Sequence, residues 1–138
     1  MVKLFKLSLL VSCLLCGCTP KEKAEVPIKK KDIVIDELFS IDSDTYLVYF
    51  YSEQCRHCLN IKDDMDNFYS TYSGDMFFLS TDTNEVSFNS MKSALIGVDN
   101  ITDFYIVGTP SLIRFIDHKV DEYYLGEKEI LEYISGAK

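Results

Sequence analysis

The apolar positions in the first half of the chain predict two buried strands joined by an amphipathic helix. Residues 45–51 are apolar on both parities and rich in aromatic side chains, which is typical of a central strand covered on both faces. Between residues 58 and 72, apolar side chains recur at helical spacing with polar ones opposite, and Gly74 ends this helix. Residues 76–79 form a second apolar run. A helix between two strands predicts a right-handed βαβ unit with parallel strands.

The second half of the chain predicts an antiparallel hairpin followed by a helix. Residues 111–116 and 120–125 are apolar segments separated by three residues, a connection short enough to force antiparallel pairing. Gly126 ends the hairpin, and residues 127–135 carry apolar side chains on one helical face. The chain therefore predicts a mixed sheet with helices packed against it.

The segments between these elements carry weaker patterns. Residues 31–35 alternate in the manner of an edge strand, and residues 36–40 have the pattern of a helical turn capped by Asp36. Residues 91–96 and 103–106 are candidate short helices in a region whose boundaries the pattern leaves open.

The first residues have the features of a secretory signal. Their apolar stretch, residues 7–15, is far shorter than the roughly 20 residues that cross a bilayer. The Leu-Cys-Gly-Cys segment that follows resembles the lipobox of bacterial lipoproteins, in which a cysteine becomes lipidated and begins the mature chain. Cys18 is the candidate anchor; Cys13 also fits the pattern, but its use would leave only a few apolar residues. We expect a signal peptide at residues 1–17 and a protein lipid-anchored at the extracytoplasmic face of a bacterial cell membrane. A short uncleaved anchor would predict the same location.

Charge divides the rest of the chain into a basic linker and an acidic domain. Residues 20–31 hold five lysines and two glutamates, whereas residues 32–138 hold 7 basic and 20 acidic side chains, a net charge of −13. We expect residues 18–31 to form a lipid-anchored linker whose lysines contact anionic head groups or are simply solvated. Residues 32–138 have room for one domain with one core. The acidity of this domain argues against a nucleic-acid partner.

Cys55 and Cys58 are the strongest chemical signal in the chain. They are separated by two residues and follow the predicted central strand at the start of a helix, where unpaired N–H groups stabilise a thiolate. A thiolate is the nucleophile in disulfide exchange. If Cys13 and Cys16 leave with the signal and Cys18 carries lipid, only this pair remains as free thiols. A disulfide that closes so short a loop stabilises little, so the pair is predicted to be a redox centre.

The order of the predicted elements resembles the thioredoxin fold over residues 32–136. Two motifs carry the resemblance: Tyr-Ser-Glu-Gln-Cys-Arg-His-Cys at 51–58, directly after a buried strand, and Val-Gly-Thr-Pro at 107–110, directly before the hairpin. The resemblance implies an α/β fold with a central mixed sheet, made of a parallel βαβ unit and a C-terminal antiparallel hairpin and flanked by helices. A compact domain of this size is similar to the small membrane-tethered thioredoxin-like lipoproteins of bacteria.

The resemblance also implies roles for four residues. Cys55 would attack a substrate disulfide, and Cys58 would resolve the mixed disulfide that results. Pro110 would follow a cis peptide bond and lie against the dithiol, where the backbone of Thr109 would pair with an extended substrate. Apart from the resemblance, Pro110 has the ordinary interpretation of a trans proline that starts a strand.

Arg56 and His57 bear on the direction of the reaction. Positive charge or hydrogen-bond donors near Cys55 stabilise its thiolate and thereby the reduced protein, which makes a stronger oxidant. A histidine just before the second cysteine is typical of disulfide-forming oxidases of this family, so His57 favours an oxidase or isomerase. Alternatively, both side chains point into water and have little effect. Two residues depart from the thioredoxin pattern: Tyr49 replaces a buried aspartate that moves protons to and from the resolving cysteine, and Gln54 replaces a tryptophan.

Three alternatives compete with an oxidase. A membrane-tethered reductase would use the same two cysteines, and a redox-inactive accessory domain would need neither. Cys55, His57 and Cys58 could bind Cu(I) or Zn(II) in a metal-delivery module, but a structural zinc site needs four ligands and the only other histidine, His118, falls in the predicted hairpin. We expect a monomeric enzyme that has no cofactor or metal and exchanges disulfides with protein thiols and with a membrane or extracytoplasmic redox partner.

Overall fold

The computed structural model describes residues 29–136 of the chain. The predicted signal peptide lies outside the described residues, together with Cys13, Cys18 and most of the linker. Every helix within residues 29–136 is too short or too polar to span a bilayer.

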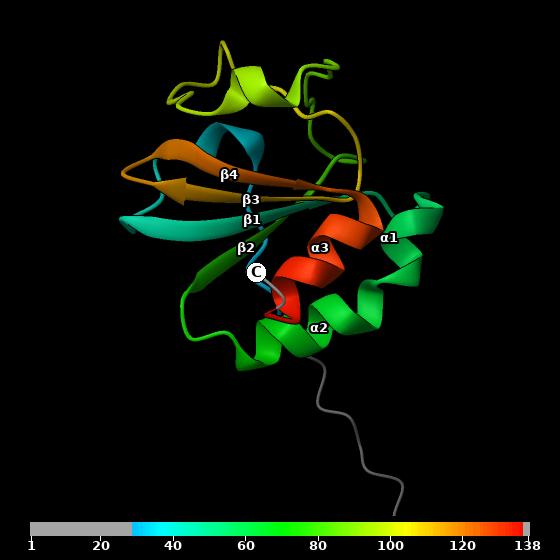
Figure 1. Cartoon of the computed structure of the whole chain (residues 1–138). Coiled ribbons are helices and arrows are strands. Elements are labelled where there is room, and N and C mark those ends of the chain that lie inside the picture. Colours follow the sequence, from blue (N-terminus) through cyan, green and yellow to red (C-terminus); the bar gives the residue numbers. More distant parts are fainter. Residues whose placement is uncertain (1–28, 137–138) are drawn as a thin grey trace, which may run out of the picture.

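Four strands form one mixed sheet at the centre of the domain (Figure 1). In spatial order they are β2 (Asp75–Ser80), β1 (Thr45–Tyr51), β3 (Ser111–Ile116) and β4 (Lys119–Leu125). β1 pairs in parallel with β2 and antiparallel with β3, and β3 pairs antiparallel with β4. The predicted βαβ unit and the predicted hairpin are both confirmed.

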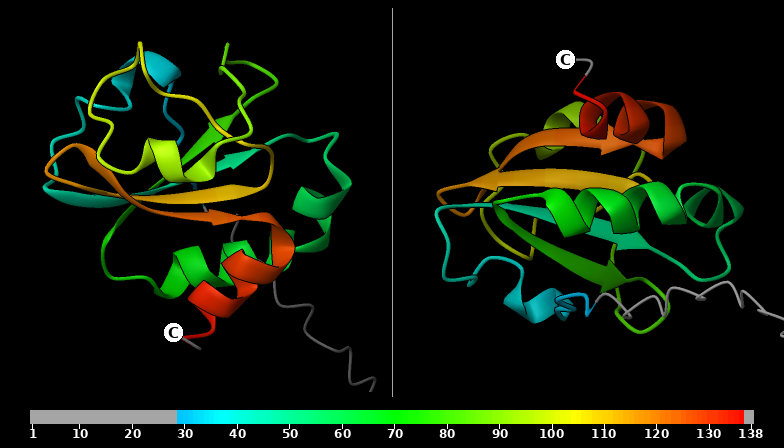
Figure 2. Two further views of the ribbon diagram at one scale, coloured as in Figure 1. Left: turned by 45° about the horizontal axis from the view of Figure 1, so that its top comes forward. Right: turned by 90° about the horizontal axis from the view of Figure 1, so that it is seen from below.

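Different parts of the chain cover the two faces of the sheet. The helices α2 (Lys62–Thr71) and α3 (Gly126–Ile134) pack on one face, and Figure 2 shows both in front of the sheet in the view from below. The other face is covered by the 3₁₀ turn η1 (Ile35–Glu37) and by the connection from β2 to β3, which contains the 3₁₀ turn η2 (Lys92–Leu95).

β1 is apolar on both parities because its alternate side chains enter two separate cores. Tyr46, Val48 and Phe50 pack with the residues of the β2–β3 connection. Leu47 and Tyr49 pack on the opposite face, beneath α2 and α3. All five side chains are almost fully buried, as expected for a central strand.

The single helix predicted after the dithiol is divided into two. α1 (Arg56–Asn60) and α2 meet at Ile61, whose backbone (φ −105°, ψ 10°) leaves the helical range. The side chain of Ile61 is 1% exposed and packs in the core between the sheet and the helices α2 and α3, which we call the helix-side core. This burial anchors the chain at the bend. The helix also ends at Thr71, earlier than the predicted stop at Gly74.

The edge strand predicted at residues 31–35 is reduced to one isolated bridge. Asp32 pairs in parallel with Phe78 of β2. Two hydrogen bonds of 2.9 Å flank the bridge, one from Ile33 N–H to the Phe78 carbonyl and one from Phe78 N–H to the Lys31 carbonyl. The chain leaves the sheet after this point because it turns into η1.

The cap predicted for the turn that follows is wrong. The 3₁₀ turn η1 begins after Val34, not after Asp36. The carboxylate of Glu37 accepts a hydrogen bond from Val34 N–H at 3.0 Å and so satisfies a backbone donor at the start of the turn.

Of the two short helices predicted between β2 and β3, only the first exists, as the 3₁₀ turn η2. The helix predicted at residues 103–106 is wrong, because Ile106 instead forms a parallel bridge with Phe88. Phe104 and Ile106 are both buried. Two side chains separated by one residue point the same way only in extended chain, so this core favours extension over a helix.

The hairpin and the last helix follow the sequence prediction closely. Asp117 and His118 form the two-residue turn of the hairpin, with φ values of 50° and 60°. Two-residue turns with positive φ are favoured because they match the right-handed twist of the paired strands. β4 begins at Lys119, inside the predicted connection. α3 begins and ends one residue earlier than the predicted helix at 127–135.

Candidate active site

The turn that carries the dithiol lies beyond the carboxyl end of β1. The carboxylate of Asp82 accepts hydrogen bonds from Ser52 Oγ and from Glu53 N–H, both at 2.7 Å, and so fixes the start of this turn. Cys55 is the N-cap of α1, and its sulfur accepts a hydrogen bond from Cys58 N–H at 3.2 Å. The predicted dithiol at a helix start is therefore confirmed.

The two thiols have different environments and opposite acidities. Both are free; Cys55 is partly exposed, whereas Cys58 is 5% exposed. Burial acts to raise the pKa of Cys55, but hydrogen bonds with the side chains of Cys58 and Thr109 and with the N–H groups of Cys58 and His57 outweigh it and lower this pKa. Burial and the neighbouring Cys55 raise the pKa of Cys58 to about 11. At neutral pH the exposed sulfur is thus the better nucleophile.

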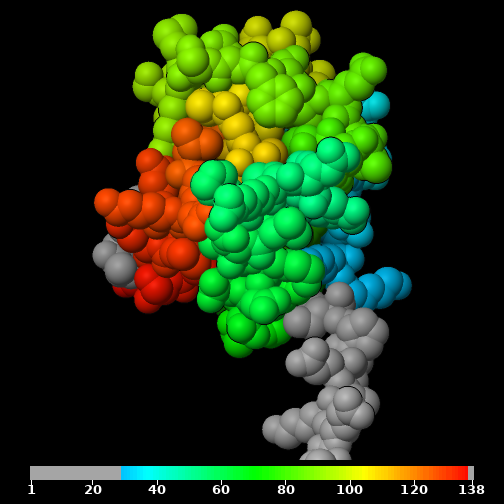
Figure 3. Space-filling model, turned by 90° about the vertical axis from the view of Figure 1, so that its right-hand side faces the viewer, coloured from blue at the N-terminus to red at the C-terminus, as the bar shows by residue number. Residues whose placement is uncertain are grey.

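The loop before β3 lies against the exposed thiol. The Thr109–Pro110 peptide bond is cis, as predicted. The sulfur of Cys55 donates a hydrogen bond to the carbonyl oxygen of Thr109 over 3.4 Å. Figure 3 shows this yellow segment directly beside the blue-green start of α1. The structure thus brings together Cys55, Cys58, Thr109 and Pro110, although the two pairs lie far apart in the sequence.

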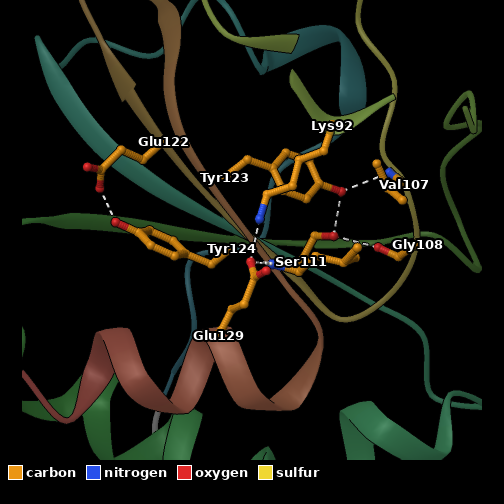
Figure 4. Close-up of polar contacts among 9 residues, drawn as sticks. Lys92, Val107, Gly108, Ser111, Glu122, Tyr123, Tyr124 and Glu129 are labelled. Atoms are coloured by element: carbon orange, nitrogen blue, oxygen red, sulfur yellow. Dashed lines mark hydrogen bonds and ion pairs between the residues drawn. The ribbon is translucent and has the colours of Figure 1, made fainter. Parts of the chain in front are cut away.

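A buried chain of hydrogen bonds holds this loop in place (Figure 4). Val107 N–H donates to the hydroxyl of Tyr123 at 2.8 Å, and that hydroxyl contacts Ser111 Oγ at 2.7 Å. Ser111 Oγ in turn donates to the carbonyl of Gly108 at 2.5 Å. Ser111 is fully buried and Tyr123 nearly so. Neither residue was predicted from the sequence as part of the site, although a serine that directly follows Thr-Pro in an apolar strand is a visible signal.

The side chains of the two residues between the cysteines are exposed. His57 Nδ1 lies 2.5 Å from Oε1 of Glu127 in α3, and Asn60 Nδ2 donates to the same oxygen at 2.8 Å. These contacts tie α1 to the start of α3 and lower the pKa of Glu127, through the hydrogen bonds from His57 and then Asn60. His57 acts on Cys55 through its backbone N–H. A tuning effect of the His57 and Arg56 side chains stays a prediction.

The two residues that depart from the thioredoxin pattern differ in burial. Gln54 is exposed beside the dithiol. Tyr49 is 4% exposed and lies beneath the dithiol in β1. Burial, followed by the nearby thiols of Cys58 and Cys55, raises the pKa of its hydroxyl, so Tyr49 stays protonated at any physiological pH.

Metal-ligand geometry is lacking around the dithiol in the described part of the chain. Within residues 29–136, no group of three or more His, Cys, Asp or Glu side chains could hold a metal ion. The imidazole of His57 contacts Glu127. His118 lies in the β3–β4 turn, at the opposite end of the sheet from α1 (Figure 1).

The domain is similar to solved structures of thioredoxins. Thioredoxin from Trypanosoma brucei brucei matches with a TM-score of 0.56 at 16% identity, over 86% of this chain and 96% of that one. Thioredoxin Mala s 13 from Malassezia sympodialis matches with a TM-score of 0.55 at 13% identity, over 78% and 90% of the two chains. A mutant thioredoxin from Halobacterium salinarum matches with a TM-score of 0.52 at 18% identity, over 78% and 89% of the two chains.

These similarities show that the chain has the thioredoxin fold, which confirms the predicted fold class. They show the fold alone, because the sequence identities are low. No protein-family model matches the chain, and neither does any curated protein sequence.

Proposed function

We propose that this protein is a thiol–disulfide oxidoreductase that exchanges disulfides with protein substrates through Cys55 and Cys58. The observation that carries the proposal is the asymmetry of the pair. One thiol is partly exposed and has a lowered pKa, whereas the other is buried one helical turn away and has a raised pKa. A nucleophile needs to be ionised and accessible, while a resolving thiol needs to be protected until the mixed disulfide forms.

The reaction proceeds in two exchange steps. The Cys55 thiolate attacks one sulfur of a substrate disulfide; the S–S bond breaks, and the departing sulfur takes up a proton. Cys58 then loses its proton and attacks the Cys55 sulfur, which breaks the mixed disulfide and releases the second substrate thiol. Two electrons have passed from the protein to the substrate, and the protein holds a Cys55–Cys58 disulfide. The reverse sequence oxidises a substrate dithiol.

Thr109 and Pro110 serve substrate binding in this proposal. The carbonyl of Thr109 lies at the attacking sulfur, so the backbone of a substrate that runs past Cys55 lies beside this loop. Val107, Ser111 and Tyr123 hold the loop in the position that this requires.

The direction we propose is that of an oxidase or isomerase. The hydrogen bonds that lower the pKa of Cys55 stabilise the reduced protein relative to the disulfide, and this raises the reduction potential. Equilibration with glutathione tests the direction. A potential of about −120 mV fits an oxidase, whereas one of about −270 mV would favour the alternative, a membrane-tethered reductase.

We further propose that the protein acts as a monomer at the extracytoplasmic face of a bacterial membrane, anchored by a lipid on Cys18. The motif at residues 15–18 and the basic linker support this location. Labelling of the full chain with a fatty acid in a bacterial host tests it. Wild-type protein and Cys13→Ser should carry the label, and Cys18→Ser should not; labelled Cys18→Ser would overturn the assignment.

Substitution of the proposed nucleophile tests the enzyme proposal. Cys55→Ser should lose exchange with a disulfide-bonded peptide altogether, because serine cannot form the mixed disulfide. Purified wild-type protein should contain no stoichiometric zinc or copper. Full exchange by Cys55→Ser would overturn the proposal, and bound metal that Cys55→Ser releases would favour a metal-delivery module.

A further inference from the structure

Tyr49 places a hydroxyl in the helix-side core without a good hydrogen bond. Its side chain is 4% exposed, and its Oη has no partner of standard geometry among the described residues. A buried hydroxyl without a partner opposes folding, so such a group calls for a reason other than stability.

The ring of Tyr49 does not supply that reason. It stacks on Tyr51 with ring centroids 5.9 Å apart and meets the edge of Phe78 at 5.8 Å. A phenylalanine would make the same ring contacts and would bury no hydroxyl. The packing of this site therefore requires an aromatic ring but not an oxygen.

The hydroxyl lies where the chemistry of Cys58 needs a polar group. Tyr49 and Cys58 line the same cavity of about 380 Å³, which is large enough to hold water. The thiol of Cys58 interacts with the Tyr49 hydroxyl, although the two groups do not form a standard hydrogen bond in the dithiol state. The charged groups that line this cavity come from the linker, the dithiol turn and α2: Lys30, Glu53, Lys62 and Asp66.

The resolving step gives the hydroxyl a role. Cys58 must lose its proton in a buried site before it attacks the mixed disulfide, and a thiolate there needs hydrogen-bond donors. Tyr49 keeps its own proton and can donate it in a hydrogen bond, whereas the paired carboxylate of Asp66 can only accept.

We propose that the Tyr49 hydroxyl donates a hydrogen bond to the Cys58 thiolate during the resolving step, while water in the cavity takes up the proton that Cys58 releases. The Cys58 S–H bond breaks, the Cys55–Cys58 bond forms, and the substrate sulfur leaves with the electron pair of the mixed disulfide. Tyr49 is neither oxidised nor deprotonated. The inference rests on the proposed oxidoreductase function and adds the Tyr49 hydroxyl to the groups of its site.

Tyr49→Phe tests the inference, with Tyr51→Phe as the matched control because Tyr51 lines the same cavity. A mixed disulfide between Cys55 and a chromophoric aromatic thiol is formed in a stopped-flow instrument, and release of the thiol is followed between pH 5 and pH 10. In Tyr49→Phe, release at neutral pH should slow by about tenfold, and its pH midpoint should rise by about one unit, because one hydrogen bond to a charged sulfur is lost. Tyr51→Phe should behave as wild type.

Two further readouts separate this role from a structural one. Formation of the mixed disulfide should be as fast in Tyr49→Phe as in wild type, and the melting temperature should be unchanged or higher. A fluorinated tyrosine at position 49, which is a stronger donor, should restore or exceed the wild-type release rate. Equal release rates and pH midpoints in Tyr49→Phe and wild type would overturn the inference. Failure of wild-type protein to form the mixed disulfide would instead overturn the oxidoreductase proposal.

Discussion

At the scale of single residues, hydrogen bonds to Cys55 and burial of Cys58 together give the two thiols different acidities. Cys55 and Cys58 are one helical turn apart, yet the N–H groups at the start of α1 point at the sulfur of Cys55 only. Cys58 contributes one of those N–H groups, and its own sulfur is buried. The same short sequence thus produces one acidic thiol and one that is hard to ionise.

This difference predicts a pH dependence of alkylation. Because the pKa of Cys55 is lowered, its thiolate persists to lower pH than that of an ordinary thiol, whose pKa is about 8.5. Cys58, with a pKa of about 11, stays a protected thiol across this range. Iodoacetamide followed by peptide mass spectrometry should modify Cys55 with a pH midpoint below that of a free cysteine peptide and leave Cys58 unmodified. A midpoint for Cys55 at or above that of a free cysteine peptide would contradict the assignment of the nucleophile.

Ser111 is the second residue whose environment leads to a prediction. Ser111→Ala removes two buried hydrogen bonds. The Gly108 carbonyl loses the hydroxyl that donates to it, and the Tyr123 hydroxyl loses its side-chain partner. Urea denaturation should show a loss of about 1–3 kcal/mol in the free energy of unfolding. Exchange activity should fall as well, because the loop that contacts Cys55 loses its support.

A serine on the surface supplies the control for Ser111→Ala. Ser70 is exposed and its Oγ contacts a carbonyl one turn earlier in α2, at Asn67. Ser70→Ala should change the free energy of unfolding by less than about 0.5 kcal/mol. Equal stability and activity of Ser111→Ala and Ser70→Ala would show that the buried chain of hydrogen bonds does not position the loop.

At the scale of elements, the sequence predicted what local pattern determines and missed what tertiary contacts determine. The two-faced pattern of β1 and the short connection at Asp117 and His118 specify a central strand and a hairpin by themselves. The bend at Ile61 accompanies burial of that side chain in the same core as Met65 of α2, and helical periodicity continues across it. The extended chain at Phe104 and Ile106 likewise follows from burial of both side chains against the face of the sheet opposite α2 and α3.

The residues of the candidate site also fall into two groups: those that a local motif predicts and those that only tertiary contacts reveal. Cys55, Cys58, Thr109 and Pro110 were identified because motifs carry them. Ser111, Tyr123 and Glu127 were missed, because they act through contacts between segments that are distant in the sequence. Tyr49 was noted only as a departure from a pattern. Its meaning depends on the cavity that it shares with Cys58, which no sequence pattern shows.

The contact between α1 and α3 predicts an effect on the reduction potential. Glu127→Gln removes a negative charge beside His57, next to the dithiol. The field at Cys55 becomes more positive, the thiolate is stabilised, and the potential should rise by on the order of 10 mV, a small effect because the pair is exposed. Glu132→Gln is the control, since Glu132 lies on α3 but pairs with Lys128 of the same helix. An unchanged or lower potential in Glu127→Gln would contradict a role of this contact in tuning the dithiol.

At the scale of the whole molecule, the sheet brings the two halves of the site together. β1 delivers Cys55 and Cys58 through α1, while its antiparallel neighbour β3 begins at the same end of the sheet, directly after Pro110. The chain has the thioredoxin fold, and this topology is what joins residues that are more than fifty positions apart. The acidic surface of the domain, with a net charge of −13 over residues 32–138, favours substrates that are not themselves strongly acidic.

In the proposed reaction Cys55 attacks a substrate disulfide and Cys58 resolves the product. Trapping the mixed disulfide between these two steps is the decisive experiment. Cys58→Ser, in its reduced form, is incubated with a disulfide-bonded protein and analysed by non-reducing mass spectrometry. We expect a covalent adduct linked through Cys55, stable until a thiol is added, and no adduct with Cys55→Ser. An adduct with Cys55→Ser but not with Cys58→Ser, or no adduct with either variant, would contradict the proposed reaction.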